Sequence, residues 1–109
     1  MRLITRAEAQ GLHVNVAEPR LDAASALAFK RALRHAMKGS SGPVVLDLSQ
    51  VTVIDSSGLG ALIAIARQLA PHRALHLSGL SPPVARVFHL TRMDSVFTIL
   101  ESSSAAGRQ

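Results

Sequence analysis

The sequence of 109 residues contains no cysteine, no tryptophan and no tyrosine, and it has only three phenylalanines. Without cysteine, the chain forms no disulfide bond and offers no thiolate to a metal ion. Proteins that bind single-stranded nucleic acids usually stack the bases on aromatic rings, and this chain has few of them. We therefore expect no nucleic-acid partner, and we interpret the net charge of +5 as a preference for an acidic protein partner or as an aid to solubility.

Long apolar segments are also absent from the sequence. The first ten residues lack the apolar stretch of a secretory signal. The longest nearly apolar run, residues 59–66, is much shorter than the roughly 20 residues that cross a bilayer. We therefore expect a cytoplasmic protein that has no membrane partner.

The composition is that of an ordinary folded domain, with 48% hydrophobic and 17% charged residues. A chain of this length has room for one domain. We expect that domain to occupy residues 1–100 and to be a monomer when free. The remaining residues 101–109, with the sequence ESSSAAGRQ, form a polar tail that has too little apolar surface to order itself.

Apolar periodicity predicts the order strand, strand, helix, strand, helix, strand, helix, strand. The period of two in residues 12–16 is typical of a half-buried strand, and the apolar stripe of residues 26–37 is typical of an amphipathic helix. Asp22 is expected to cap a first helix that ends near Lys38 and is followed by Gly39. Ser81 is expected to cap the third helix, and the last strand is expected at residues 96–100. This order predicts an α/β domain with a mixed four- to five-stranded sheet and helices mainly on one face.

A short polar segment, DSSG at residues 55–58, separates the third predicted strand from the nearly apolar second helix. Such loops at the carboxyl ends of strands are where α/β domains place their working residues. The simplest interpretation is that one of the three polar side chains caps the helix. A cap needs only one of them, so three in a row indicate a further role.

The sequence VVLDLSQVTVIDSSGLGALI at residues 44–63 resembles the STAS family, the domain of sulphate transporters and anti-sigma factor antagonists, and in particular the free-standing antagonists. The motifs RLD at residues 20–22 and SPPVARVFHLT at residues 81–91 support the resemblance. It implies that Ser56, directly after Asp55, is phosphorylated by a serine kinase that is also the anti-sigma factor. A metal-dependent serine phosphatase would reverse the reaction. The unphosphorylated form would bind the kinase and free the sigma factor.

The resemblance also implies a partner-binding surface and no catalytic role for the chain itself. The expected partner-binding residues are Asp22, Asp55, Ser56, Ser57, Gly58, Leu59 and Gly60. One departure from the family pattern is Arg20, which stands where the family usually has Glu. A second expected partner contact is the basic face of the first helix, formed by Lys30, Arg31, Arg34 and Lys38.

Alternatives from other classes stay open at this point. A scaffold subunit of a signalling complex or of a lipid-transport ATPase would have the same fold, and a basic single-strand binder would use the basic face of the first helix. A hydrolase with Ser56 as nucleophile is disfavoured, because Ile54 stands where such enzymes need glycine. The five histidines show no metal-ligand spacing, so we expect no metal and no cofactor.

Overall fold

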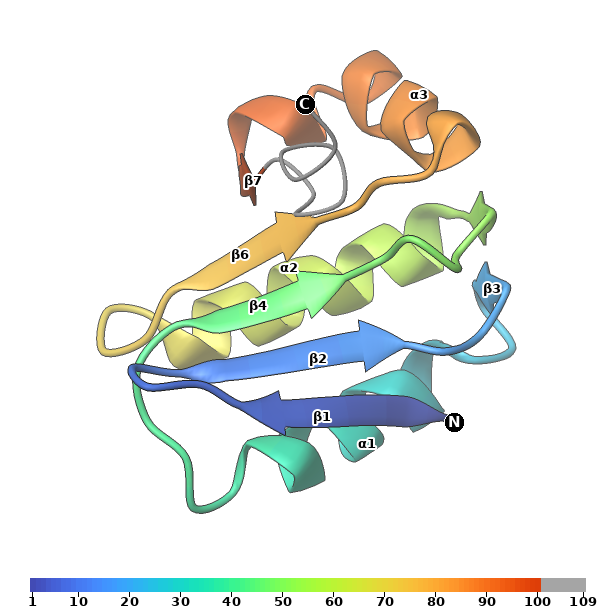
Figure 1. Ribbon diagram of the computed structural model, residues 1–109. Coiled ribbons are helices and arrows are strands. Elements are labelled where there is room, and N and C mark those ends of the chain that lie inside the picture. The colour runs from blue at the N-terminus through green and yellow to red at the C-terminus, as the bar shows by residue number, and fades with distance from the viewer. Residues whose placement is uncertain (101–109) are drawn as a thin grey trace, which may run out of the picture.

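Five strands form one mixed sheet in the computed structural model, which describes residues 1–100 (Figure 1). The spatial order is β1-β2-β4-β6-β7, in which β1 runs antiparallel to β2 and all other neighbours are parallel. The predicted mixed sheet is therefore confirmed. The strands are β1 (Leu3–Ala7), β2 (Leu12–Val16), β4 (Val44–Asp47), β6 (Leu75–Ser78) and β7 (Thr98–Leu100).

Two helices, α1 (Ala26–Met37) and α2 (Ser56–Leu69), lie side by side behind the sheet. The third helix, α3 (Pro82–Leu90), stands beyond the end of β6 and is followed by a single 3₁₀ turn, η1 (Met93–Ser95). In the described part of the chain, no helix lies over the opposite face of the sheet (Figure 1). The expected placement of the helices mainly on one face is thus confirmed.

The alternation of apolar and polar residues decides which face of the sheet is covered. Val14, Leu46 and Leu77 are paired across three neighbouring strands, and all are fully buried beneath the helices. The next row of the sheet contains His13 and His76, which point to the uncovered face and are half-buried. A period of two therefore separates core from surface along each strand.

The first helix begins later than predicted, and Asp22 is not its cap. Residues 22–25 form a tight turn in which the Asp22 carbonyl accepts the amide protons of Ser25 and Ala26. The Asp22 carboxylate instead bonds Arg20 and Ser25, so it is not free to cap a helix. The predicted helix end is confirmed, because Gly39 follows with a positive φ of 78°.

Ser81 occupies the expected N-terminal position of α3, but its hydroxyl has another use. Ser81 Oγ donates to the carbonyl oxygen of Val51 at 2.6 Å and makes no capping bond. The bond ties α3 to the segment that leads into β5 (Val53–Ile54). The last strand, β7, begins at Thr98 and not at residue 96 as predicted. It follows the 3₁₀ turn η1, which the sequence patterns did not predict.

A second small sheet was also missed by the sequence patterns. The strand β3 (Arg20–Leu21) pairs in parallel with β5, with Leu21 opposite Ile54. Two-residue strands are too short to show alternation. This pair extends the end of the domain at which the carboxyl ends of the parallel strands lie (Figure 1).

Candidate functional site

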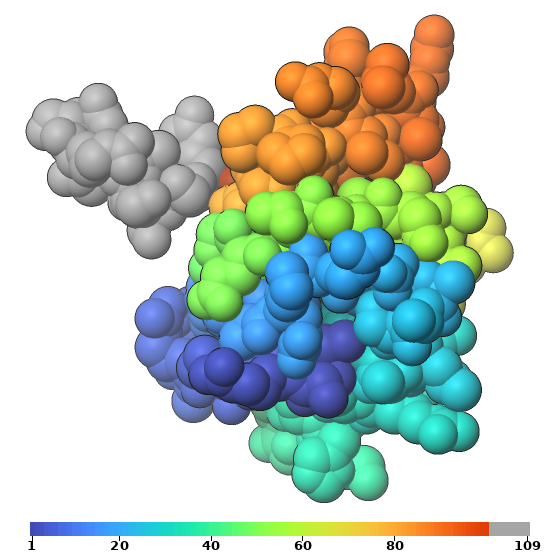
Figure 2. All heavy atoms as spheres, turned by 90° about the vertical axis from the view of Figure 1, so that its right-hand side faces the viewer, coloured from blue at the N-terminus to red at the C-terminus, as the bar shows by residue number. Residues whose placement is uncertain are grey.

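The β3–β5 pair brings together two loops that are far apart in the sequence. Because Leu21 lies opposite Ile54, the residues that follow them, Asp22 and Asp55, leave the pair at the same level. Figure 2 looks onto this end of the molecule, where the light blue segment near residue 20 lies beside the green segment near residue 55. We refer to two segments together as the switch loop. They are residues 20–25, and residues 55–60, which include the first turn of α2.

Asp55 holds the two halves of the switch loop together. Its Oδ1 accepts the amide proton of Gly58 at 3.0 Å, which caps α2. Its Oδ2 accepts the amide proton of Ala23 at 3.1 Å, across to the other half. The carboxylate is therefore the cap that the sequence left unassigned, and it also fixes the distance between the two segments.

Ser56 and Ser57 are the first two residues of α2, and both are exposed. Since Asp55 makes the capping bond, neither hydroxyl is needed to begin the helix. The amide groups of a first helical turn have no partner within the helix, and the helix dipole places partial positive charge there. The two hydroxyls therefore stand at a point of the surface that favours an anion.

The remaining predicted residues of this segment differ in where they lie. Gly58 is buried, and a Cβ atom there would overlap the backbone carbonyl of Leu21. Leu59 belongs to the core and keeps only 8% of its exposure. Gly60 is exposed, and a Cβ there would meet open space. Gly60 is thus accessible from outside, whereas Gly58 and Leu59 support the loop from beneath.

Asp22 and Arg20 form an ion pair on the other half of the switch loop. Arg20 Nε donates to Asp22 Oδ2 at 3.0 Å, and Ser25 Oγ donates to Asp22 Oδ1 at 3.2 Å. The Arg20 hydrogen bond, helped by that of Ser25, holds the pKa of the Asp22 carboxyl below its usual value although partial burial opposes this. Arg20 therefore neutralises the carboxylate beside it.

Ser25 was not singled out from the sequence, yet it organises this turn. Its hydroxyl accepts the Asp22 amide proton at 3.0 Å and also lies within bonding distance of the Arg20 carbonyl. The available signal was a serine three residues after an aspartate, a spacing at which a side chain can close a local turn.

The basic face of α1 lies apart from the switch loop, along the outer side of the helix pair. Arg31, Arg34 and Lys38 are exposed and Lys30 is half-buried. Arg34 Nε donates to Gln68 Oε1 of α2 at 2.9 Å. The structure thus places the predicted basic residues along one stretch of α1 and joins that stretch to α2.

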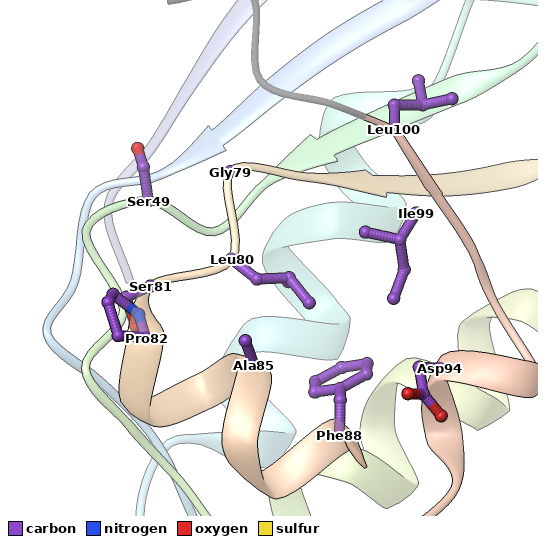
Figure 3. Close-up of a pocket in the computed structure, with 10 residues that line it drawn as sticks. All are labelled: Ser49, Gly79, Leu80, Ser81, Pro82, Ala85, Phe88, Asp94, Ile99 and Leu100. Atoms are coloured by element: carbon purple, nitrogen blue, oxygen red, sulfur yellow. The ribbon is translucent and has the colours of Figure 1, made fainter. Parts of the chain in front are cut away.

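A shallow hollow of about 600 Å³ lies between α3 and β7 (Figure 3). Leu80, Phe88 and Ile99 point into it, and Ser49 and Asp94 stand at its rim. It contains none of the predicted site residues. Residues 1–100 hold no group of three or more potential metal ligands, and no helix in this part of the chain is long and apolar enough to cross a membrane.

A protein-family model described as "Mlab, STAS domain" matches residues 4–101. A relative from Bordetella bronchiseptica, BtrV, bears the name of an anti-sigma factor antagonist and is 38% identical over 64 residues. That match covers 58% of this chain and 55% of BtrV, so it spans about half the length of that relative.

Solved structures extend the similarity to almost the whole chain. An anti-sigma factor antagonist from Mycobacterium paratuberculosis is 25% identical, with a TM-score of 0.81 over 96% of this chain and 89% of that one. The phosphorylated form of the Bacillus cell fate determinant SpoIIAA is 16% identical, with a TM-score of 0.63 over 98% of each chain. The second likeness concerns the fold alone.

Proposed function

The chain belongs to the STAS domain family, and on that premise we propose that it is an anti-sigma factor antagonist that phosphorylation of Ser56 switches off. In the unphosphorylated state, the switch loop docks on an anti-sigma factor that is also a serine kinase, and the sigma factor is released. The partial match to a relative named as an antagonist supports this function.

The observation that carries the proposal is the position of Ser56. Its side chain is exposed at the first residue of α2, while the neighbouring Asp55 makes the hydrogen bonds that the loop needs. The hydroxyl is thus available to a kinase without local unfolding. Phosphorylated SpoIIAA has this same fold, which supports the view that the fold accommodates a phosphate.

The chemistry belongs to the partners and not to this chain. The kinase transfers the γ-phosphoryl group of ATP to Ser56 Oγ, and ADP and the hydroxyl proton leave. A metal-dependent serine phosphatase restores the hydroxyl by hydrolysis and releases inorganic phosphate. We propose no catalytic residue, metal or cofactor for the antagonist itself.

The experiment that tests the assignment is phosphate mapping by mass spectrometry after incubation with the cognate kinase and ATP. We expect one phosphate, on Ser56, and no labelling of the Ser56→Ala variant. Ser57→Ala is the matched control, because it removes the adjacent exposed hydroxyl, and it should be labelled like the unaltered protein. A phosphate on Ser57, or labelling that survives Ser56→Ala, would refute the assignment.

A second candidate is a scaffold subunit of a signalling complex or of a lipid-transport ATPase. The observation that favours it is the family model, whose description names Mlab and no antagonist. The two functions differ in whether the partner can be released. Capture of partners with Ser56→Ala and Ser56→Glu baits separates them, because an antagonist loses its partner in the Ser56→Glu form and a permanent subunit keeps it.

A further inference from the structure

The two helices behind the sheet carry charge of one sign only. Neither α1 nor α2 contains an aspartate or a glutamate. Lys30, Arg31 and Arg34 lie in α1, Lys38 follows directly after it, and Arg67 lies in the last turn of α2. The excess of positive charge in this protein is therefore concentrated on the helical layer.

The four basic residues of α1 and its C-cap lie on one side of that helix, and we refer to them, together with Arg67 at the end of α2, as the basic ridge. Residues 30, 34 and 38 follow one another at a spacing of four and so share one side of α1. The Arg34 hydrogen bond to Gln68 shows that this side faces α2, and Arg67 is adjacent to Gln68 in the sequence. Arg31, Arg34, Lys38 and Arg67 are all exposed.

No acidic residue among residues 1–100 forms a salt bridge with these charges. Within residues 1–100, the salt bridges join other residues, namely Arg6 to Glu8, Arg20 to Asp22 and His89 to Asp94. Like charges four residues apart on a helix repel one another. The ridge therefore costs the free domain some stability, and an anionic surface placed against it would remove that cost.

We propose that the basic ridge is a second docking surface, which binds an acidic segment of the protein partner that docks on the switch loop. The inference rests on the proposed function. The exposed Leu27, with 53% of its surface accessible, precedes Arg31 by four residues and so lies on the same side of α1. A protein partner can bury such an apolar side chain beside its acidic groups. The one phenylalanine in these two helices, Phe29, is fully buried, so neither helix exposes a phenylalanine, tyrosine or tryptophan ring on which the bases of a single-stranded nucleic acid could stack.

Binding of a labelled peptide of 12 glutamates to the full, unphosphorylated chain tests the ridge directly. Amide chemical shifts should change in α1 and around residues 67–68. Arg31→Glu should weaken binding about fivefold at low ionic strength, and the difference should vanish near 1 M salt, where the Debye length is about 3 Å. The matched control is Arg86→Glu, an exposed arginine on α3, and it should bind like the unaltered protein.

Equal weakening by the two variants would show that only net charge matters and would overturn the proposal. Shift changes spread over the whole surface would do the same. The assignment to an acidic protein would be refuted if a 12-nucleotide thymidine strand, or vesicles containing phosphatidylglycerol, bound as tightly as the peptide. No kinase is needed in this experiment, so its result stands apart from the identity of the phosphorylated serine.

Discussion

The switch loop and the basic ridge both include residues of α2 and offer exposed side chains, but they are built in different ways. The switch loop depends on directed contacts, chiefly the two bonds of Asp55 and the close approach of Gly58 to Leu21. The ridge depends on a net charge to which several residues contribute and which makes few directed bonds. We therefore expect the loop to respond to changes in geometry and the ridge to respond to salt.

The largest expected effect is that of the phosphate on partner docking. A phosphoserine carries a charge of about −1.5 to −2 at neutral pH, and the N-terminal turn of α2 tolerates it in the free domain. In a packed interface, an uncompensated charge costs about 3 to 5 kcal/mol, which lowers affinity roughly a hundred- to a few thousand-fold.

The same phosphate should leave the fold of the free domain nearly unchanged. Thermal unfolding and backbone amide spectra of the phosphorylated and unmodified proteins measure this. We expect similar melting temperatures and shift changes confined to residues 54–62. A fall in melting temperature of many degrees would show that the phosphate acts by refolding the domain.

A smaller effect is expected on the free energy of unfolding when two glycines of α2 are each replaced by alanine. Gly58→Ala should lower the free energy of unfolding by about 2 kcal/mol, because the added Cβ overlaps a backbone carbonyl. Gly60→Ala should raise it by about 0.5 to 1 kcal/mol, because alanine favours the helix and open space receives its Cβ.

Denaturant unfolding of the two variants measures this difference. Gly60→Ala should also bind the partner more weakly although it is more stable, since its new methyl group projects from the exposed side of the switch loop. If Gly60→Ala binds like the unaltered protein, the partner does not approach that turn closely.

The smallest expected effect concerns the ion pair between Arg20 and Asp22. Because Arg20 lowers the pKa of Asp22, the pair stabilises the folded state above the usual aspartate pKa of about 4. That stability is lost as the pH falls through the lowered pKa.

The variant Arg20→Gln tests this. It should be less stable than the unaltered protein at pH 7, and the difference should shrink as the solution is acidified below about pH 4. Arg86→Gln on α3 is the control and should show no such trend. A difference between the two proteins that stays constant from pH 7 into acid would exclude this role for the pair.

Sequence patterns predicted the elements that have enough residues to show a period. The alternation in β2 and the apolar stripe of α1 each cover several residues. The structure has β2 at the predicted residues, and α1 covers the apolar stripe although it begins after the predicted cap at Asp22. The β3–β5 pair was missed, because two residues carry no period and their pairing joins positions 33 apart. The late start of α1 was missed for a related reason. The Asp22 carboxylate bonds Arg20 and Ser25 and so does not cap the helix, and these contacts have no periodic pattern in the sequence.

For the candidate site, the motif indicated Ser56, but it could not separate Gly58 from Gly60. Both are glycines at the start of one helix, and only the approach of the Leu21 carbonyl distinguishes them. That approach comes from the β3–β5 pair, which the sequence did not reveal. Local residues thus indicated which side chains belong to the candidate site, whereas the division of that site into supporting and accessible positions depends on a long-range contact.

The bond between Asp55 and the Ala23 amide, which spans 32 positions of the chain, also bears on how quickly the switch can respond. A loop that is already closed in the free protein need not be ordered when a partner arrives, so association loses little conformational entropy. The encounter rate, and not a rearrangement, then limits docking. With no slow structural step of its own, this domain would follow changes in its phosphorylation state as fast as the kinase and the phosphatase turn over.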